Sequence, residues 1–156
     1  MRRKDREVTD RSEILAIMKQ CDVCRIAFAC DEYPYIVPMN FGLTETDGEV
    51  TLYFHSALEG KKLRALQQNP KVGFEMDRGH ELIVGQSACD CTMAYESVIG
   101  YGTMEILGEN EKEKALGFLV AHYRESEEIV FEKAILDKTA VLKLTVEKMT
   151  AKRLTK

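Results

Sequence analysis

Residues 33–62 read YPYIVPMNFGLTETDGEVTLYFHSALEGKK, and this stretch decides the fold. Apolar side chains alternate with other residues from Tyr35 to Phe41, which is the period of a β-strand. The turn signal Thr46-Asp47-Gly48 then leads to a returning strand over Val50–His55. Together these segments predict one hairpin, in which residues 37–40 lie beside residues 53–56. A helix opening near Gly60 follows directly.

Outward from this stretch, the pattern predicts about six strands and three helices. Asp10 and Glu13 have the spacing of a capping box before a short first helix. Pro38 interrupts its strand and marks an edge, a bulge or the end of pairing, because proline cannot donate to a ladder. The other expected strands are 23–30, 71–77, 97–107 and 138–149, the helices are 14–20, 59–68 and 111–124, and residues 78–93 are expected as a loop. Long hairpins and strand glycines favour an antiparallel β-barrel with helices over a doubly wound parallel sheet.

Composition narrows the class of protein. The 156 residues match one domain, expected over 1–156, with 45% hydrophobic and 31% charged residues. No eighteen-residue apolar run predicts a membrane span, and MRRKDREVTD lacks the apolar stretch of a secretory signal, so a cytoplasmic protein is expected. The net charge of -4 argues against a nucleic-acid binder. Five cysteines without an export signal are expected to be reduced.

A candidate anion site lies where the returning strand meets the helix. Ser56 ends the strand, and Lys61 and Lys62 open the helix. Unpaired N–H groups and the helix dipole favour an anion at such a place, and a phosphate monoester suits it. The spacing is not that of a Walker loop. The alternative from spacing alone is that both lysines form a solvated helix face.

The order of several motifs resembles a known family. VPMNFG at 37–42, YFHSA at 53–57, GKKLRALQQNPKVGFEMD at 60–77 and SVIGYG at 97–102 are similar to the pyridoxamine-phosphate-oxidase-like split barrels. The likeness is closer still to the Nim-type nitroimidazole-resistance branch and covers most of the chain. The oxidase branch has an Arg on its first hairpin strand and Arg-Lys at the helix start. Here there is no arginine between Tyr33 and Gly60, which argues against pyridoxamine-phosphate oxidation.

The resemblance implies a fold, a cofactor and a partner. It implies a six-stranded antiparallel Greek-key split barrel that binds FMN as a homodimer, with the flavin in a groove between subunits. Lys61 and Lys62 match the residues that hold the FMN phosphate, with Ser56 nearby. The first hairpin strand would lie along the flavin ring, partly through its main-chain groups. That strand supplies Val37, Pro38, Met39 and Asn40 as cofactor contacts, and the strand at 97–102 is expected to contribute across the interface.

Histidines and cysteines allow a structural as well as a functional interpretation. His55 titrates in the range useful for proton transfer, and the Nim-type branch has a histidine near the flavin at this place, so it is the candidate catalytic residue. His80 and His122 have no motif around them and are expected at the surface. Cys21 and Cys24 are not placed like a thioredoxin motif. A zinc site at Cys89-Asp90-Cys91 with His80 lacks recognisable spacing, so no metal site is expected, and the cysteines are expected to be buried and apolar in role.

The leading hypothesis is an FMN-dependent oxidoreductase. Electrons would arrive from NADH, NADPH or another donor and leave to a small electron-poor acceptor, of which a nitroaromatic is the most concrete by resemblance. A flavin-binding protein with little turnover, serving as a carrier, store or stress sensor, is the alternative from another class. A split barrel that uses haem or a deazaflavin is the third, because a fold does not fix a function.

Overall fold

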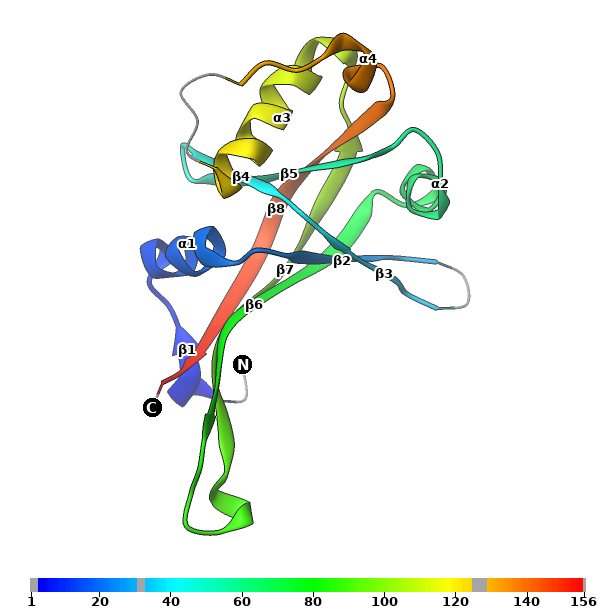
Figure 1. The fold of residues 1–156 in the computed structure, drawn as a ribbon. Helices are drawn as coiled ribbons and strands as arrows, with labels where there is room; N and C mark the ends of the chain where they lie inside the picture. The colour runs from blue at the N-terminus through cyan, green and yellow to red at the C-terminus, as the bar shows by residue number, and fades with distance from the viewer. Residues whose placement is uncertain (1–2, 31–32, 125–128, 156) are drawn as a thin grey trace.

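A computed structural model describes residues 3–30, 33–124 and 129–155 (Figure 1). Within this part of the chain, eight strands and four α-helices alternate with two short 3-10 helices. The strands are β1 Glu7–Val8, β2 Cys24–Phe28, β3 Tyr35–Met39, β4 Gly42–Thr46, β5 Glu49–Ala57, β6 Lys71–Ile83, β7 Thr92–Ile106 and β8 Thr139–Leu154. The helices are α1 Arg11–Gln20, α2 Lys61–Gln68, α3 Glu109–Tyr123 and α4 Lys133–Leu136, with 3-10 turns η1 Lys4–Arg6 and η2 Ala88–Asp90.

The strands form one antiparallel sheet in the order β3-β2-β6-β7-β8-β5-β4, and β1 pairs with the end of β8. Because β3 and β4 are consecutive in the chain but end opposite sides of this path, the sheet curls so that its two ends approach at the β3–β4 corner (Figure 1). The expected fold class, an antiparallel split barrel with helices, is confirmed. The described residues hold two more strands than the six expected, because β1 was not foreseen and the run at 35–42 divides into β3 and β4.

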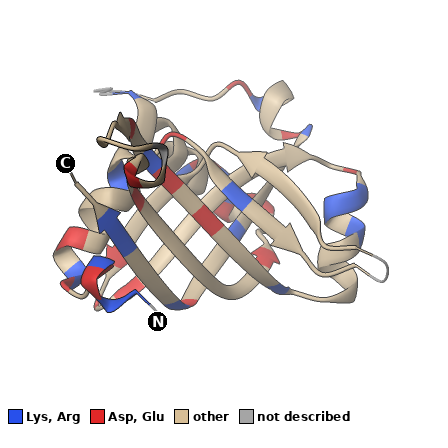
Figure 2. Cartoon of the chain, turned by 90° about the horizontal axis from the view of Figure 1, so that it is seen from below, with Lys and Arg blue, Asp and Glu red and all other residues tan. Residues whose placement is uncertain are grey.

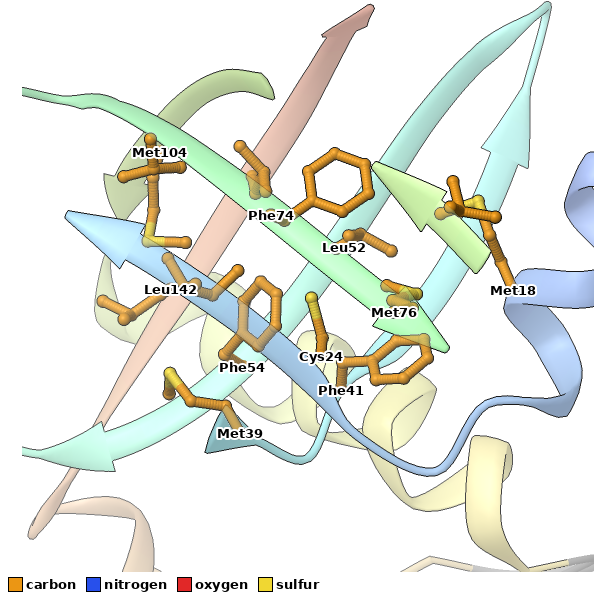
Figure 3. Packing of buried hydrophobic residues seen from close by; sticks show 14 of the residues in the cluster. Met18, Cys24, Met39, Phe41, Leu52, Phe54, Phe74, Met76, Met104 and Leu142 are labelled. Carbon is orange, nitrogen blue, oxygen red and sulfur yellow. The ribbon is translucent and has the colours of Figure 1, made fainter. Parts of the chain in front are cut away.

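The core fills the inside of the curled sheet with large apolar side chains. Phe41, Phe54 and Phe74, from three different segments, belong to one cluster of buried side chains that also contains Cys24, Leu52, Leu142 and several methionines (Figure 3). Phe41 and Phe54 are fully buried. Burying such side chains stabilises by about 1.5–3 kcal/mol each relative to exposure. The alternating burial along β2 and β5 shows which face of each strand looks into the barrel.

Helices α1 and α3 are each fixed by a specific feature of the sequence. Asp10 caps α1 by accepting hydrogen bonds from the backbone N–H groups of Ser12 (2.7 Å) and Glu13 (3.1 Å), as the capping pattern predicts. Helix α3 lies across β4, where a Cβ placed on Gly42 would be only 2.5 Å from the backbone nitrogen of Leu119. Glycine therefore allows the helix backbone to approach the strand closely.

The expected pairing of the hairpin is wrong in part. A two-residue Asp47-Gly48 turn does join two paired strands, but these are β4 and β5, with Gly42 opposite Tyr53. Residues 37–40 do not lie beside residues 53–56: β3 pairs with β2 instead, with Pro38 opposite Arg25. The run breaks at Phe41 because its N–H donates to the Tyr123 hydroxyl (3.0 Å) of α3 rather than to a strand.

The loop expected over 78–93 is also wrong. Strands β6 and β7 continue through most of it as a long two-stranded arm, interrupted by a register shift between Arg78 and Glu81 (Figure 1). Gly79 lies there with φ +69°, a left-handed conformation that glycine adopts easily. The arm extends away from the barrel, so its residues lack the core-facing alternation by which a strand is recognised in a sequence. Among the described residues, no helix has the length and apolar character needed to cross a membrane.

Candidate functional site

The start of α2 presents unsatisfied positive charge. Its N-cap residue, Gly60, has φ 141° and offers no side chain to cap the first N–H groups. Lys61 is exposed and Lys62 half-buried, and no carboxylate among the described residues lies within ion-pair distance of either ammonium. Arg64 adds a third cation, and the helix itself carries no acidic residue (Figure 2). Positive charge and uncapped N–H groups at a helix start suit the binding of an anion.

Strand β3 runs close to the same helix end. The Lys61 ammonium lies 4.7 Å from the centroid of the Tyr35 ring, on the first residue of β3. The structure therefore brings together the two segments that the sequence separates by more than twenty residues. A ligand with an anionic tail at α2 can reach the strand with its remaining part.

Strand β3 is the end of the sheet path, so one of its two edges has no strand partner among the described residues. Its side chains alternate: Val37 and Met39 turn toward the core, whereas Pro38 and Asn40 are exposed. Because Pro38 has no N–H, its pair with Arg25 is a non-hydrogen-bonded one, so the backbone groups of Val37 and Met39 point to β2, and those of Ile36 and Pro38 point to the open edge. An open strand edge supplies N–H and C=O groups suited to a flat, polar-edged ring.

His55 and Ser56 do not act from the same side of β5. Ser56 is 6% exposed and faces the barrel interior, where its hydroxyl donates to the Ala57 carbonyl (3.0 Å). His55 is exposed on the opposite face, opposite Val141 of β8. Adjacent residues of a strand point to opposite faces. A single ligand group therefore cannot contact the side chains of both His55 and Ser56.

The last turn of α3 fixes the corner between β3 and β4. The Tyr123 hydroxyl accepts from Phe41 N–H and donates to the Asp22 carbonyl (2.8 Å). His122 Nε2 lies 2.8 Å from the Cys21 carbonyl, so this nitrogen carries the proton and donates. Its ring packs 4.2 Å from the Phe41 ring. The expectation that His122 lies at the surface is wrong, because its side chain is half-buried between α3 and the β3–β4 corner.

The outer face of β3, β2, β6 and β7 is apolar and hollowed. A depression of about 390 Å³ is lined by Arg25, Ala27, Ile36, Gly73, Phe74, Glu75, Ile99 and Gly100. Ile36 is 61% exposed and Ile99 58%. Tyr101 is 51% exposed on the same side, paired with Gly73. Contiguous exposed apolar side chains of this kind mark interaction surfaces.

Cysteines divide into two groups. Cys21 and Cys24 are buried; burial raises the pKa of Cys21 to about 11 and holds the pKa of Cys24 well above its usual range. Cys89 and Cys91 are exposed near the tip of the β6–β7 arm, so the expectation of buried thiols is wrong for them. All five are free thiols. Within the described ranges, no cluster of three or more His, Cys, Asp or Glu side chains is arranged to hold a metal ion.

Sequence reasoning missed Tyr35 and Tyr123. Tyr35 stands at the start of an evident strand, so nothing in its spacing distinguishes it from a core residue. Tyr123 lies more than eighty residues from the corner it fixes, and a contact of that separation leaves no local pattern.

The sequence profile of the family described as pyridoxamine 5'-phosphate oxidase matches residues 10–153. A candidate 5-nitroimidazole antibiotic resistance protein from Bacteroides thetaiotaomicron is 34% identical, with a TM-score of 0.80, covering 94% of this chain and 85% of that one. Among curated proteins, none matches.

Two further solved structures share the fold at lower identity. An FAD- and heme-binding protein from Mycobacterium smegmatis is 20% identical with a TM-score of 0.82, over 97% of this chain and 74% of that one. A flavocytochrome from Azotobacter vinelandii is 19% identical with a TM-score of 0.83, over 100% of this chain and 72% of that one. At these identities the likeness concerns the fold alone.

Proposed function

Because this chain belongs to the pyridoxamine 5'-phosphate oxidase-like family, we propose that it binds FMN and reduces a small electron-poor compound, a nitroaromatic in particular. The observation that carries the proposal is the lysine pair at the start of α2, which has no carboxylate partner among the described residues and lies beside the open edge of β3. The likeness to a candidate nitroimidazole-resistance protein supports the choice of acceptor.

The helix start fits a phosphate monoester. The ammonium groups of Lys61 and Lys62 have no carboxylate partner among the described residues, and the uncapped N–H groups of α2 add donors. A hydrogen bond to a charged group contributes about 1.5–3 kcal/mol. In this proposal, two such lysines neutralise the dianion and account for a preference for FMN over riboflavin. Ser56, whose hydroxyl is turned inward, has a supporting place in the wall beside them.

The edge of β3 fits the flavin ring. In the proposal, the backbone groups at the open edge, which belong to Ile36 and Pro38, bond the polar edge of the ring system, while the side chains of Pro38 and Asn40 lie against it from the exposed side. The backbone groups of Val37 and Met39 remain in the ladder with β2, so these two residues support the strand. Pro38 has no N–H, so part of this edge offers only acceptors. The Tyr123 hydroxyl holds the end of the strand in place through Phe41.

A second copy of the chain completes the site in this proposal. The exposed Ile36, Ile99 and Tyr101 and the hollow between them supply an apolar face next to β3, and burying it would favour a homodimer. Strand β7 carries two of these residues, so its outer side would face the partner's cofactor groove.

When bound, FMN supplies transfer of two electrons between a donor such as NADH or NADPH and the acceptor. The chain's own residues bind and orient it, and exclude water where the two subunits meet. Two-electron reduction of a nitro group to a nitroso group and water also consumes two protons. His55 is exposed on β5 and an imidazole can both accept and donate a proton, so we assign it to proton delivery.

The proposal is tested by the cofactor that purifies with the protein and by its dependence on the lysines. We expect FMN, identified by mass spectrometry and by flavin absorbance, and bleaching by NADH or NADPH that a nitroaromatic reverses. Bleaching without reversal would indicate a flavin carrier, and a haem spectrum would contradict the proposal.

The variant Lys61→Met/Lys62→Met should lose at least tenfold in FMN affinity while its riboflavin affinity stays near that of the parent, since one lost charged contact corresponds to about tenfold or more. The matched control is Lys133→Met/Lys138→Met, which removes two exposed lysines around α4. Equal FMN affinity in the two double variants would contradict the phosphate assignment.

A further inference from the structure

We propose that Tyr35 is a positioning residue that fixes the Lys61 ammonium for the phosphate and thereby strengthens the preference for FMN over riboflavin. The proposal rests on the proposed function and adds to it a residue that holds no part of the ligand itself. It concerns how one of the two lysines is made ready before the ligand arrives.

The geometry places the Tyr35 ring between the barrel core and the helix. On one side the ring lies 6.2 Å from the ring of Phe28, centroid to centroid, with the planes tilted by 34°. Phe28 is 1% exposed, and Tyr35 packs against the same core cluster. On the other side the Lys61 ammonium lies 4.7 Å from the ring centroid. The cation therefore sits on a surface that the core itself holds in place.

A lysine on an exposed helix start otherwise has many conformations. Its four-carbon stem rotates freely, and binding an anion immobilises it at a cost in side-chain entropy. A cation within about 6 Å of a ring face is attracted to it. Because a ring face makes no directed hydrogen bond, it restrains the ammonium while its N–H donors stay available to a phosphate.

The two lysines are therefore not equivalent. Within the described ranges, Lys62 has no aromatic partner, whereas Lys61 has Tyr35 and no carboxylate partner. The effect of changing Tyr35 should accordingly depend on Lys61 being present. A merely structural role for Tyr35 would affect both flavins alike.

The test is the ratio of riboflavin to FMN dissociation constants, measured by fluorescence titration of flavin-free protein. Riboflavin lacks only the phosphate, so the ratio isolates the phosphate contribution. Tyr35→Leu should lower the ratio about threefold, the size of an exposed cation–π contact. Tyr35→Phe keeps the ring and should keep the ratio. In a Lys61→Met background, Tyr35→Leu should leave the ratio unchanged.

Tyr95→Leu is the matched control, because Tyr95 lies on β7 opposite Leu154, at the other end of the barrel from α2. A ratio unaltered by Tyr35→Leu in a protein that prefers FMN would overturn the positioning role alone. A parent protein without any preference for FMN would overturn the phosphate site itself, and this role with it.

A measurement on the unaltered protein covers the case in which Tyr35→Leu does not fold. A side chain held over an aromatic face experiences a ring current, so the ε-methylene protons of Lys61 should resonate upfield of those of the other lysines. An ordinary chemical shift for these protons would overturn the proposal.

Discussion

Replacing Gly42 by alanine should destabilise the protein, because α3 lies directly on this residue. A Cβ at Gly42 would be 2.5 Å from both the Leu119 nitrogen and the Phe118 carbonyl carbon, which falls 0.9 Å short of the 3.4 Å at which ordinary contact begins. Both atoms belong to helix backbone, so no side chain can rotate out of the way. The helix and strand must separate by roughly that distance.

Overpacking of this kind costs about 1–3 kcal/mol. For a chain of this length, each kcal/mol lowers the melting temperature by about 2–4 °C. Gly42→Ala should therefore melt about 2–12 °C below the parent in a calorimetric or circular-dichroism scan. Because α3 also holds the β3–β4 corner through Tyr123, the variant should lose flavin affinity as well.

Gly117→Ala is the control with the opposite sign. Gly117 lies inside α3, and a Cβ there would meet no described atom within 4 Å. Alanine in a helix interior stabilises by about 0.5–1 kcal/mol relative to glycine. If Gly42→Ala melts with the parent, or both variants move in the same direction, the close approach of α3 to β4 is not as described.

Three further outcomes are expected. Tyr123→Phe leaves the buried Phe41 N–H without its acceptor and should lower the free energy of unfolding in urea by about 1–3 kcal/mol. An unchanged urea midpoint would refute this role of the Tyr123 hydroxyl. Because burial raises the pKa of the Cys21 thiol to about 11, a thiol reagent at pH 8 should label exposed Cys89 in the native protein and Cys21 only after unfolding, and equal rates would contradict this burial. Burial alone would raise the pKa of Glu96, but its hydrogen bonds from Arg78 and Arg153 lower this pKa below 4.5. The carboxylate therefore stabilises the fold above that pH, and the stabilisation is lost as the pH falls through the lowered pKa. Glu96→Gln should make acid unfolding less steep, and an equally steep acid transition would argue against these ion pairs.

The elements recognisable in the sequence are those whose side chains alternate between core and solvent or follow a helical stripe. Strand β5 and helix α2 are predicted well because their apolar residues, such as Phe54 and Leu66, follow those periods. The β6–β7 arm is missed because it extends beyond the barrel core. The division of the run at 35–42 into two strands depends on Tyr123, a contact from a distant helix.

The candidate site shows the same contrast between features that follow a local sequence pattern and features that depend on distant contacts. The lysine pair at the start of α2 is a local pattern that spacing alone leaves open between a solvated helix face and an anion site, and the family resemblance favours the anion. The contact between Lys61 and Tyr35 arises because the barrel brings β3 to α2, and no local period encodes it. By contrast, His55 and Ser56 face apart because adjacent residues of a strand point to opposite faces, a local property that a reading of the motif as one unit overlooks.

The side of β3 that has no strand partner among the described residues is also a hazard, because an exposed strand can add strands from other molecules and start aggregation. Pro38, in the middle of that strand, presents no N–H to an incoming chain, and proline there interrupts the continuous ladder that fibril growth requires. A ligand bound along this strand would cover the other backbone N–H and C=O groups at its open edge. Occupancy should then protect the protein against self-association during storage and expression, apart from any chemistry that the ligand performs.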